Sequence, residues 1–119
     1  MKIAITAEKP QTDSPVDPRF GRAKVFMVYD DQLKTWEVID NKQNLQAAQG
    51  AGIQSAAKLV DAGCEVVISG HCGPKAFTAL NSANVSVYTV SNGTVQNAIN
   101  LFQAGKLTKI ESSDVEGHW

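Results

Sequence analysis

The chain has 119 residues, of which 43% are hydrophobic and 19% charged, with 11 basic and 12 acidic side chains. These values fit one soluble domain and exclude a disordered chain. The formal charge of -1 gives no general attraction to nucleic acid or to an anionic membrane, so neither is expected as a partner. The first residues, MKIAITAEKP, lack the apolar run of a signal peptide, and we expect a cytoplasmic location.

The amino-terminal part of the sequence predicts three strands. KIAIT at 2–6 reads as the first, and a loop rich in proline and turn residues follows it up to residue 24. VFMVYD at 25–30 and TWEVID at 35–40 are separated by a short polar turn, which predicts a hairpin. The stretch 41–52 shows no regular pattern.

The remainder alternates between helical and strand patterns. Strands are predicted at 65–68 and 85–90. A helix ends near Gly63, a second begins at Pro74, and a third is capped by Thr94 and ends at Gly105. The residues after 106 add at most a short edge strand. The expected inward faces of the three helices are Ile53, Ala56, Ala57 and Val60; Ala76, Phe77 and Leu80; and Val95, Ala98, Ile99 and Phe102.

The predicted order of elements is βββαβαβα, which is an α/β fold. The two later strand-helix-strand crossovers are expected to be parallel and right-handed, giving a mixed sheet with helices on both faces. We expect one domain over residues 1–110 and a polar, disordered tail over 111–119.

The candidate site lies where the parallel strands end. Loops leaving the carboxyl ends of strands 2–6, 65–68 and 85–90 converge at one edge of such a sheet. The beginning of strand 25–30 lies at the same edge, because that strand runs in the opposite direction. The candidate binding residues there are Arg19, Phe20, Gly21, Arg22, His71, Cys72, Gly73, Pro74 and Lys75.

This group of residues suits a compact anion. A helix that begins at Pro74 offers free backbone N–H groups and the positive end of its dipole. Arg19 and Arg22 add planar, permanently charged donors. The same surroundings lower a thiol pKa, so Cys72 is a candidate soft metal ligand, nucleophile or redox thiol.

The cysteines also have a structural interpretation. An extended strand between Cys64 and Cys72 separates them by roughly 20 Å, too far for a disulfide or a shared metal. Cys64 therefore reads as a small buried residue, and for Cys72 an inert buried thiol and a reactive thiol both stay open. For His71 we expect a structural role or one that orients a neighbouring ligand, rather than direct metal binding together with Cys72.

Several other functions lack their motifs. The sequence contains no CxxC pair and no phosphate-binding GxxxxGK[ST] loop. The first strand carries no carboxylate, which argues against a metal-dependent nuclease.

The sequence resembles the dinitrogenase iron-molybdenum cofactor biosynthesis family. The resemblance rests on KIAIT, SPVDPRFGRAKVFMVYD, AAKLVDAGCEVVISG, GPKAFTAL, VSVYTV and GTVQNAINLFQAGKL, which cover nearly the whole chain. It implies a ribonuclease-H-like, three-layer α/β/α fold with a five-stranded mixed sheet that has one antiparallel strand.

The resemblance also implies a function. It points to a non-catalytic carrier or assembly protein for a molybdenum-copper sulfide cluster, held by arginine, lysine and backbone N–H donors, with Phe20 and Phe77 as apolar cover. An accessory or acceptor protein is an expected partner. Whether Cys72 ligates metal or lines the pocket is left open. Two other classes remain alternatives, a thiol-dependent enzyme using Cys72 with His71 as base and a metal-free regulatory adaptor.

Overall fold

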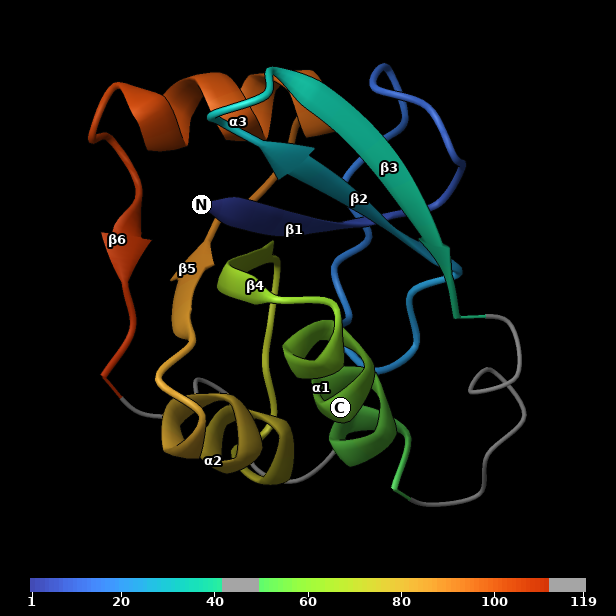
Figure 1. Ribbon diagram of the computed structural model, residues 1–119, viewed down its shortest axis with the longest axis vertical. Coiled ribbons are helices and arrows are strands. Elements are labelled where there is room, and N and C mark those ends of the chain that lie inside the picture. Colours follow the sequence, from blue (N-terminus) through green and yellow to red (C-terminus); the bar gives the residue numbers. More distant parts are fainter. Residues whose placement is uncertain (42–49, 112–119) are drawn as a thin grey trace.

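The computed structural model describes residues 1–41 and 50–111, which form one sheet and three helices (Figure 1). The elements are β1 (Lys2–Ala7), β2 (Val25–Asp30), β3 (Thr35–Asp40), α1 (Ala51–Asp61), β4 (Cys64–Ser69), α2 (Pro74–Ser82), β5 (Ser86–Thr89), α3 (Val95–Gln103) and β6 (Thr108–Lys109). The predicted order βββαβαβα is confirmed for the first eight elements. No helix in the described ranges is long and apolar enough to cross a membrane.

The sheet has six strands in the order β3-β2-β1-β4-β5-β6. Strand β1 pairs in parallel with β4, and β4 with β5, while β2 runs antiparallel to both β1 and β3. The predicted count of five strands, with one antiparallel, is wrong because β6 pairs antiparallel with β5 through Tyr88–Lys109 and Thr89–Thr108. A ladder of two residues is too short to produce a recognisable period in the sequence. The ribonuclease-H-like classification stays a prediction.

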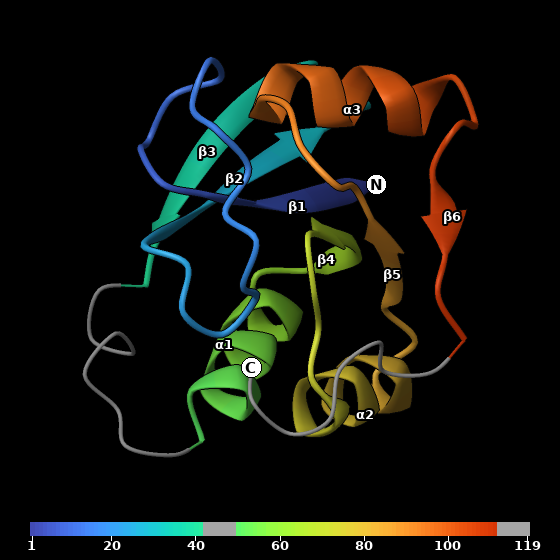
Figure 2. The same cartoon turned by 180° about the vertical axis from the view of Figure 1, so that it is seen from behind.

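The helices lie on both faces of the sheet. Helix α3 covers one face, and α1 and α2 lie side by side on the other (Figures 1 and 2). Alternate residues of each strand therefore enter two separate apolar clusters, because successive strand side chains point to opposite faces. The predicted three-layer arrangement agrees with these contacts.

The inward face of α1 differs from the predicted one. Its buried residues are Ala51, Ser55, Ala56 and Leu59. Ile53 and Val60 are 45% and 36% exposed, and Ala57 is also exposed, so only Ala56 of the predicted face is correct. The cause is Ser55, whose hydroxyl turns inward to bond the buried Asn41 side chain. A pattern of apolar residues cannot find a face that contains a buried polar group.

The starts of α2 and α3 are confirmed. Pro74 occupies the first turn of α2 after the extended residue Gly73. Thr94 caps α3 through a reciprocal capping box with Asn97. The predicted domain boundary near residue 110 stays a prediction, and all of the predicted tail except Glu111 lies outside the described residues.

Candidate functional site

The connection from β1 to β2 meets the turn that follows β4. Arg19 forms a parallel bridge with His71, and the Phe20 N–H donates to the His71 carbonyl at 3.2 Å. Figure 2 shows this connection running beside β4 down to α1. Arg19 and Phe20 of the predicted segment 19–22 therefore meet the turn after β4.

Two features fix the start of this connection against the sheet. A Cβ atom added at Gly70 would lie 2.6 Å from the Pro18 Cα, so only glycine fits this approach. The Thr6 Oγ1 donates to the Asp17 carbonyl at 2.7 Å, and the Asp17 N–H donates to the Thr6 carbonyl at 2.9 Å. These bonds hold Asp17 and Pro18 directly before Arg19, at the end of β1.

A second close approach brings in α1. A Cβ atom added at Gly21 would lie 2.8 Å from the Gly52 nitrogen, in the first turn of α1. The residues between the two arginines therefore pack against the beginning of that helix. The first turn of α1, which is not among the nine candidate residues, is a third element of the site.

The nine candidate residues divide into exposed and buried groups. Arg19 and Lys75 are exposed, and Arg22, His71 and Pro74 are half-buried. Phe20, Gly21, Cys72 and Gly73 are buried. The cationic side chains thus lie at the surface above a layer of buried residues.

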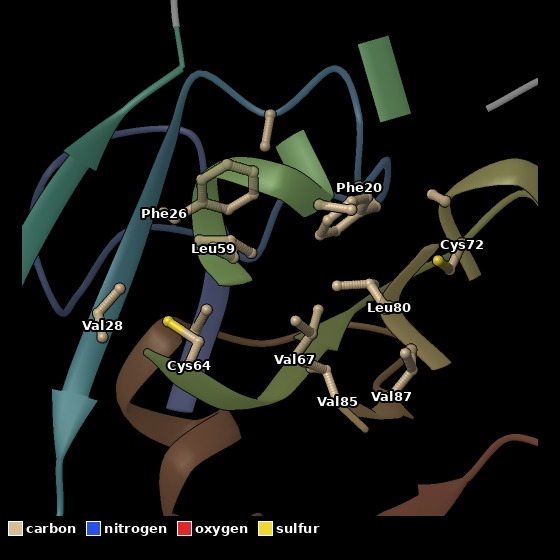
Figure 3. Close-up of a cluster of buried hydrophobic side chains, with 14 residues drawn as sticks. Phe20, Phe26, Val28, Leu59, Cys64, Val67, Cys72, Leu80, Val85 and Val87 are labelled. Atoms are coloured by element: carbon tan, nitrogen blue, oxygen red, sulfur yellow. The ribbon is translucent and has the colours of Figure 1, made fainter. Parts of the chain in front are cut away.

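Phe20 belongs to the core. It is fully buried and packs on Phe26 with ring centroids 5.6 Å apart. Figure 3 shows it with Leu59 and Leu80 in the cluster between the sheet and helices α1 and α2. The ring supports the arginine segment from below, and it offers no exposed apolar surface in this structure.

Cys72 also lies in this cluster. Its exposed fraction is 0%, and both cysteines are free and buried. Burial raises the pKa of the Cys64 thiol to about 11. Figure 3 shows Cys72 among the buried side chains of this cluster, and whether it ligates metal or lines the pocket stays a prediction.

Two hollows flank the contact between the loop and the turn. One, of about 290 Å³, is lined by Pro18, Gly70, His71, Thr89, Val90 and Ser91. The other, of about 510 Å³, is open and mostly apolar, and it is lined by Ile53, Pro74, Lys75, Thr78 and Ala79 at the beginnings of α1 and α2. Arg19 and Arg22 line neither of these two hollows. Both hollows border residues of the turn after β4, and the joint binding site of the nine candidate residues stays a prediction.

Asp17 contributes a carboxylate that the sequence reasoning did not single out. It is 5% exposed, and its Oδ1 accepts the Arg19 N–H at 2.9 Å. Burial raises the pKa of this carboxyl group, while the Arg19 N–H and the positive charge of Arg19 act in the opposite direction. The turn signal S-P-V-D-P marked a loop, but it could not show that this side chain turns inward.

Bare metal ions lack a ready set of ligands here. Among residues 1–41 and 50–111, no group of three or more histidine, cysteine, aspartate or glutamate side chains is placed to hold one. The surface instead presents guanidinium and ammonium groups next to helix starts. These groups recognise anions.

The fold and this edge define a small three-layer α/β protein with paired arginines beside the turn after β4. The sequence profile described as "Dinitrogenase iron-molybdenum cofactor" matches residues 1–105. The chain belongs to this family.

Similar proteins extend over almost the whole chain. The structure of the apo form of the orange protein from Desulfovibrio gigas has 38% sequence identity, a TM-score of 0.93 and coverage of 96% of both chains. A NifB-like protein from Thermotoga has 35% identity, a TM-score of 0.86 and coverage of 98% of both chains. An uncharacterized protein of Methanocaldococcus jannaschii is 31% identical over 114 residues, which are 93% of this chain and 92% of that protein.

Proposed function

We propose that this protein is a non-catalytic carrier or assembly protein for an anionic molybdenum-copper sulfide cluster of the thiomolybdate type. The cluster is cargo, held without covalent bonds at the edge formed by residues 19–22 and 71–75. The observation that carries the proposal is the bridge between Arg19 and His71 in a chain of this family. The similarity to the orange protein, solved in an apo form, supports it.

The electrostatics of the edge support an anionic ligand. Arg19, Arg22 and Lys75 come from two distant parts of the sequence and flank one backbone contact. The first turns of α1 and α2 contain no acidic residue, and neither helix start has a side-chain cap. Their N–H groups and helix dipoles therefore add positive potential at the same edge.

The chemistry of such a cluster fits a site without a cage of ligands. A thiomolybdate-type cluster brings its own sulfides, so its metals are already coordinated and its outer surface is negative. What it requires from protein is N–H, guanidinium and ammonium donors. This matches the exposed groups, whereas a ligand role for Cys72 requires that residue to leave the core.

A non-catalytic role is supported by the position of the thiol. A nucleophilic cysteine needs access to substrate and an adjacent base, but Cys72 is fully buried. We infer that the protein hands its cluster to an accessory or acceptor protein, which can approach the edge from the side of the exposed Arg19 and Lys75.

The test is cluster uptake by a variant that lacks both arginines. Purified protein is titrated with a preformed copper-thiomolybdate anion, followed by its visible charge-transfer bands and by molybdenum and copper analysis after gel filtration. Arg19→Gln/Arg22→Gln is expected to weaken uptake by about 100- to 10,000-fold, because each lost charge-assisted contact is worth about 1.5–3 kcal/mol and every 1.4 kcal/mol corresponds to a factor of about ten.

The matched control removes the same charge elsewhere. Lys34→Gln/Lys109→Gln alters an exposed lysine at the tip of the β2–β3 hairpin and another on the edge strand β6. This control should bind as the wild type does. Equal uptake by both double variants would refute the proposed site, and absence of uptake by the wild type would refute the proposed cargo.

A further inference from the structure

We propose that Asn41 and Ser55 are positioning residues that hold Arg22 in place for the anion. This inference rests on the proposed function and concerns the same site. Neither residue carries a charge and neither lies among the nine candidates. They act through the backbone on both sides of Arg22.

Asn41 binds the two carbonyl groups that flank Arg22. Its Nδ2 donates to the Ala23 carbonyl at 2.8 Å and, more weakly, to the Gly21 carbonyl at 3.5 Å. Its own N–H donates to the Lys24 carbonyl at 2.9 Å. Asn41, directly after β3, thus holds the peptide group that precedes Arg22 and the one that follows Ala23.

Ser55 connects this arrangement to α1. Its hydroxyl donates to the Asn41 Oδ1 at 3.2 Å and lies 3.5 Å from the Gly21 carbonyl. The orientation of the Asn41 amide follows from these partners, since its oxygen accepts from Ser55 while its nitrogen donates to the loop. The tight packing of Gly21 on Gly52 lies one turn earlier on the same helix.

Burial makes these bonds count. Asn41 and Ser55 are 0% exposed, so water does not replace a bond that is lost. An amide or hydroxyl in the core is retained only when its hydrogen bonds are formed. Since the side chain of Phe20 is already packed in the core, the network of Asn41 and Ser55 fixes the opposite end of the arginine segment.

A consequence follows for anion binding. Anion binding must restrict both the backbone and the rotamers of Arg22. A backbone that is already fixed leaves only the side-chain rotamers to be restricted. Loss of Asn41 should therefore weaken cluster binding only as long as Arg22 is present to benefit from it. This dependence distinguishes a positioning role from a general loss of stability.

The test is a double-mutant cycle on affinity for the preformed copper-thiomolybdate anion. Wild type, Asn41→Ala, Arg22→Ala and the combined variant are titrated under identical salt conditions. Asn41→Ala is expected to weaken binding by about five-fold in the wild-type background and by less than about 1.5-fold beside Arg22→Ala. Ser55→Ala, a milder change, should give the same pattern with about a two-fold effect and serves if Asn41→Ala does not fold.

The matched control is Ile99→Val, which lies in the core on the opposite face of the sheet. It lowers the melting temperature but should leave affinity unchanged in both backgrounds. If Asn41→Ala and Ser55→Ala weaken binding equally with and without Arg22, or leave it unchanged, the inference is wrong while the proposed function stands. If the wild type does not bind the anion, the proposed function fails first and the inference fails with it.

Discussion

The two faces of the sheet are built differently. On the face covered by α3, the buried cluster consists of aliphatic side chains and Met27, and the helix starts with a complete capping box. The face covered by α1 and α2 contains both cysteines, and there the buried Asn41 and Ser55 bond the arginine segment. The same strands supply both clusters, so the two faces differ in the helices that cover them and in the buried polar groups that lie beside those helices.

The difference separates two tasks. The α3 face buries apolar surface, which stabilises the fold, and the first turn of α3 holds the earlier part of the β1–β2 loop, where the Val95 N–H donates to the Ser14 carbonyl at 2.9 Å. The α1 and α2 face does this too, but it also anchors a long loop whose arginines lie at the surface. Polar groups in a core cost free energy unless they are fully hydrogen-bonded. On this face the buried Asn41 and Ser55 find their partners in the backbone of residues 19–23, so their hydrogen bonds form only when this segment is in place.

The largest expected effect concerns the apolar part of both faces. Leu59→Ala in α1 and Ile99→Ala in α3 each remove a fully buried side chain, and each should lower the free energy of unfolding by about 2–5 kcal/mol. Ile53→Ala, at a residue 45% exposed, should cost less than about 1 kcal/mol. Urea unfolding measures all three variants.

This set also tests the orientation of α1. If Ile53→Ala were as damaging as Leu59→Ala, the helix would present the face that the apolar pattern indicated, and the comparison of the two faces would lose its basis. Similar losses for Leu59→Ala and Ile99→Ala would show that both sites are packed to a similar degree, one on each face.

A smaller effect is expected where the β1–β2 loop passes Gly70, directly after β4. Gly70→Ala places a methyl group against the Pro18 backbone, and the necessary shift should cost about 1–3 kcal/mol. Because Pro18 directly precedes Arg19, this substitution should also weaken uptake of the copper-thiomolybdate anion. Differential scanning calorimetry and the visible titration give the two readings.

Gly63→Ala is the matched control for this substitution. Gly63 has a φ of +84° and open space around a Cβ atom, so alanine there costs about 1–2 kcal/mol through backbone strain alone. It should reduce stability and leave cluster uptake unchanged. If Gly70→Ala behaves in the same way, the close approach to Pro18 serves only the fold.

The sequence predicted those features that depend on local patterns. The hairpin strands at 25–30 and 35–40, Pro74 at the start of α2 and the Thr94 cap of α3 are confirmed with their residues. Each rests on an alternation or a capping preference visible within a few positions. Convergence of the arginine segment with the turn at His71 was also predictable, because it follows from the direction of the parallel strands.

The remainder depends on tertiary contacts. The predicted inward face of α1 was wrong because Ser55 turns inward to bond Asn41, which lies 14 positions away in sequence. The pairing of β6 and the burial of Phe20 likewise depend on neighbours remote in the chain. For the same reason, the division of the nine site residues into exposed and buried groups had no local signal.

The smallest effect concerns Asp17, the buried carboxyl group beside Arg19. Burial and the charge of Glu8 raise its pKa, whereas the Arg19 N–H and the charges of Arg19 and Lys24 lower it, and the net direction is upward. A carboxyl pKa above its unfolded value of about 3.9 stabilises the fold most at low pH, and this contribution disappears as pH rises through the folded pKa.

Asp17→Asn keeps an oxygen acceptor for the Arg19 N–H but cannot titrate. Its stability relative to wild type should therefore rise from about pH 4 upward and then level off, as measured by urea unfolding between about pH 3.5 and 7. A stability difference between Asp17→Asn and the wild type that stays constant across this range would show that Asp17 is solvated more freely than its burial indicates. The loop would then be held less tightly against the sheet than the comparison of the two faces requires.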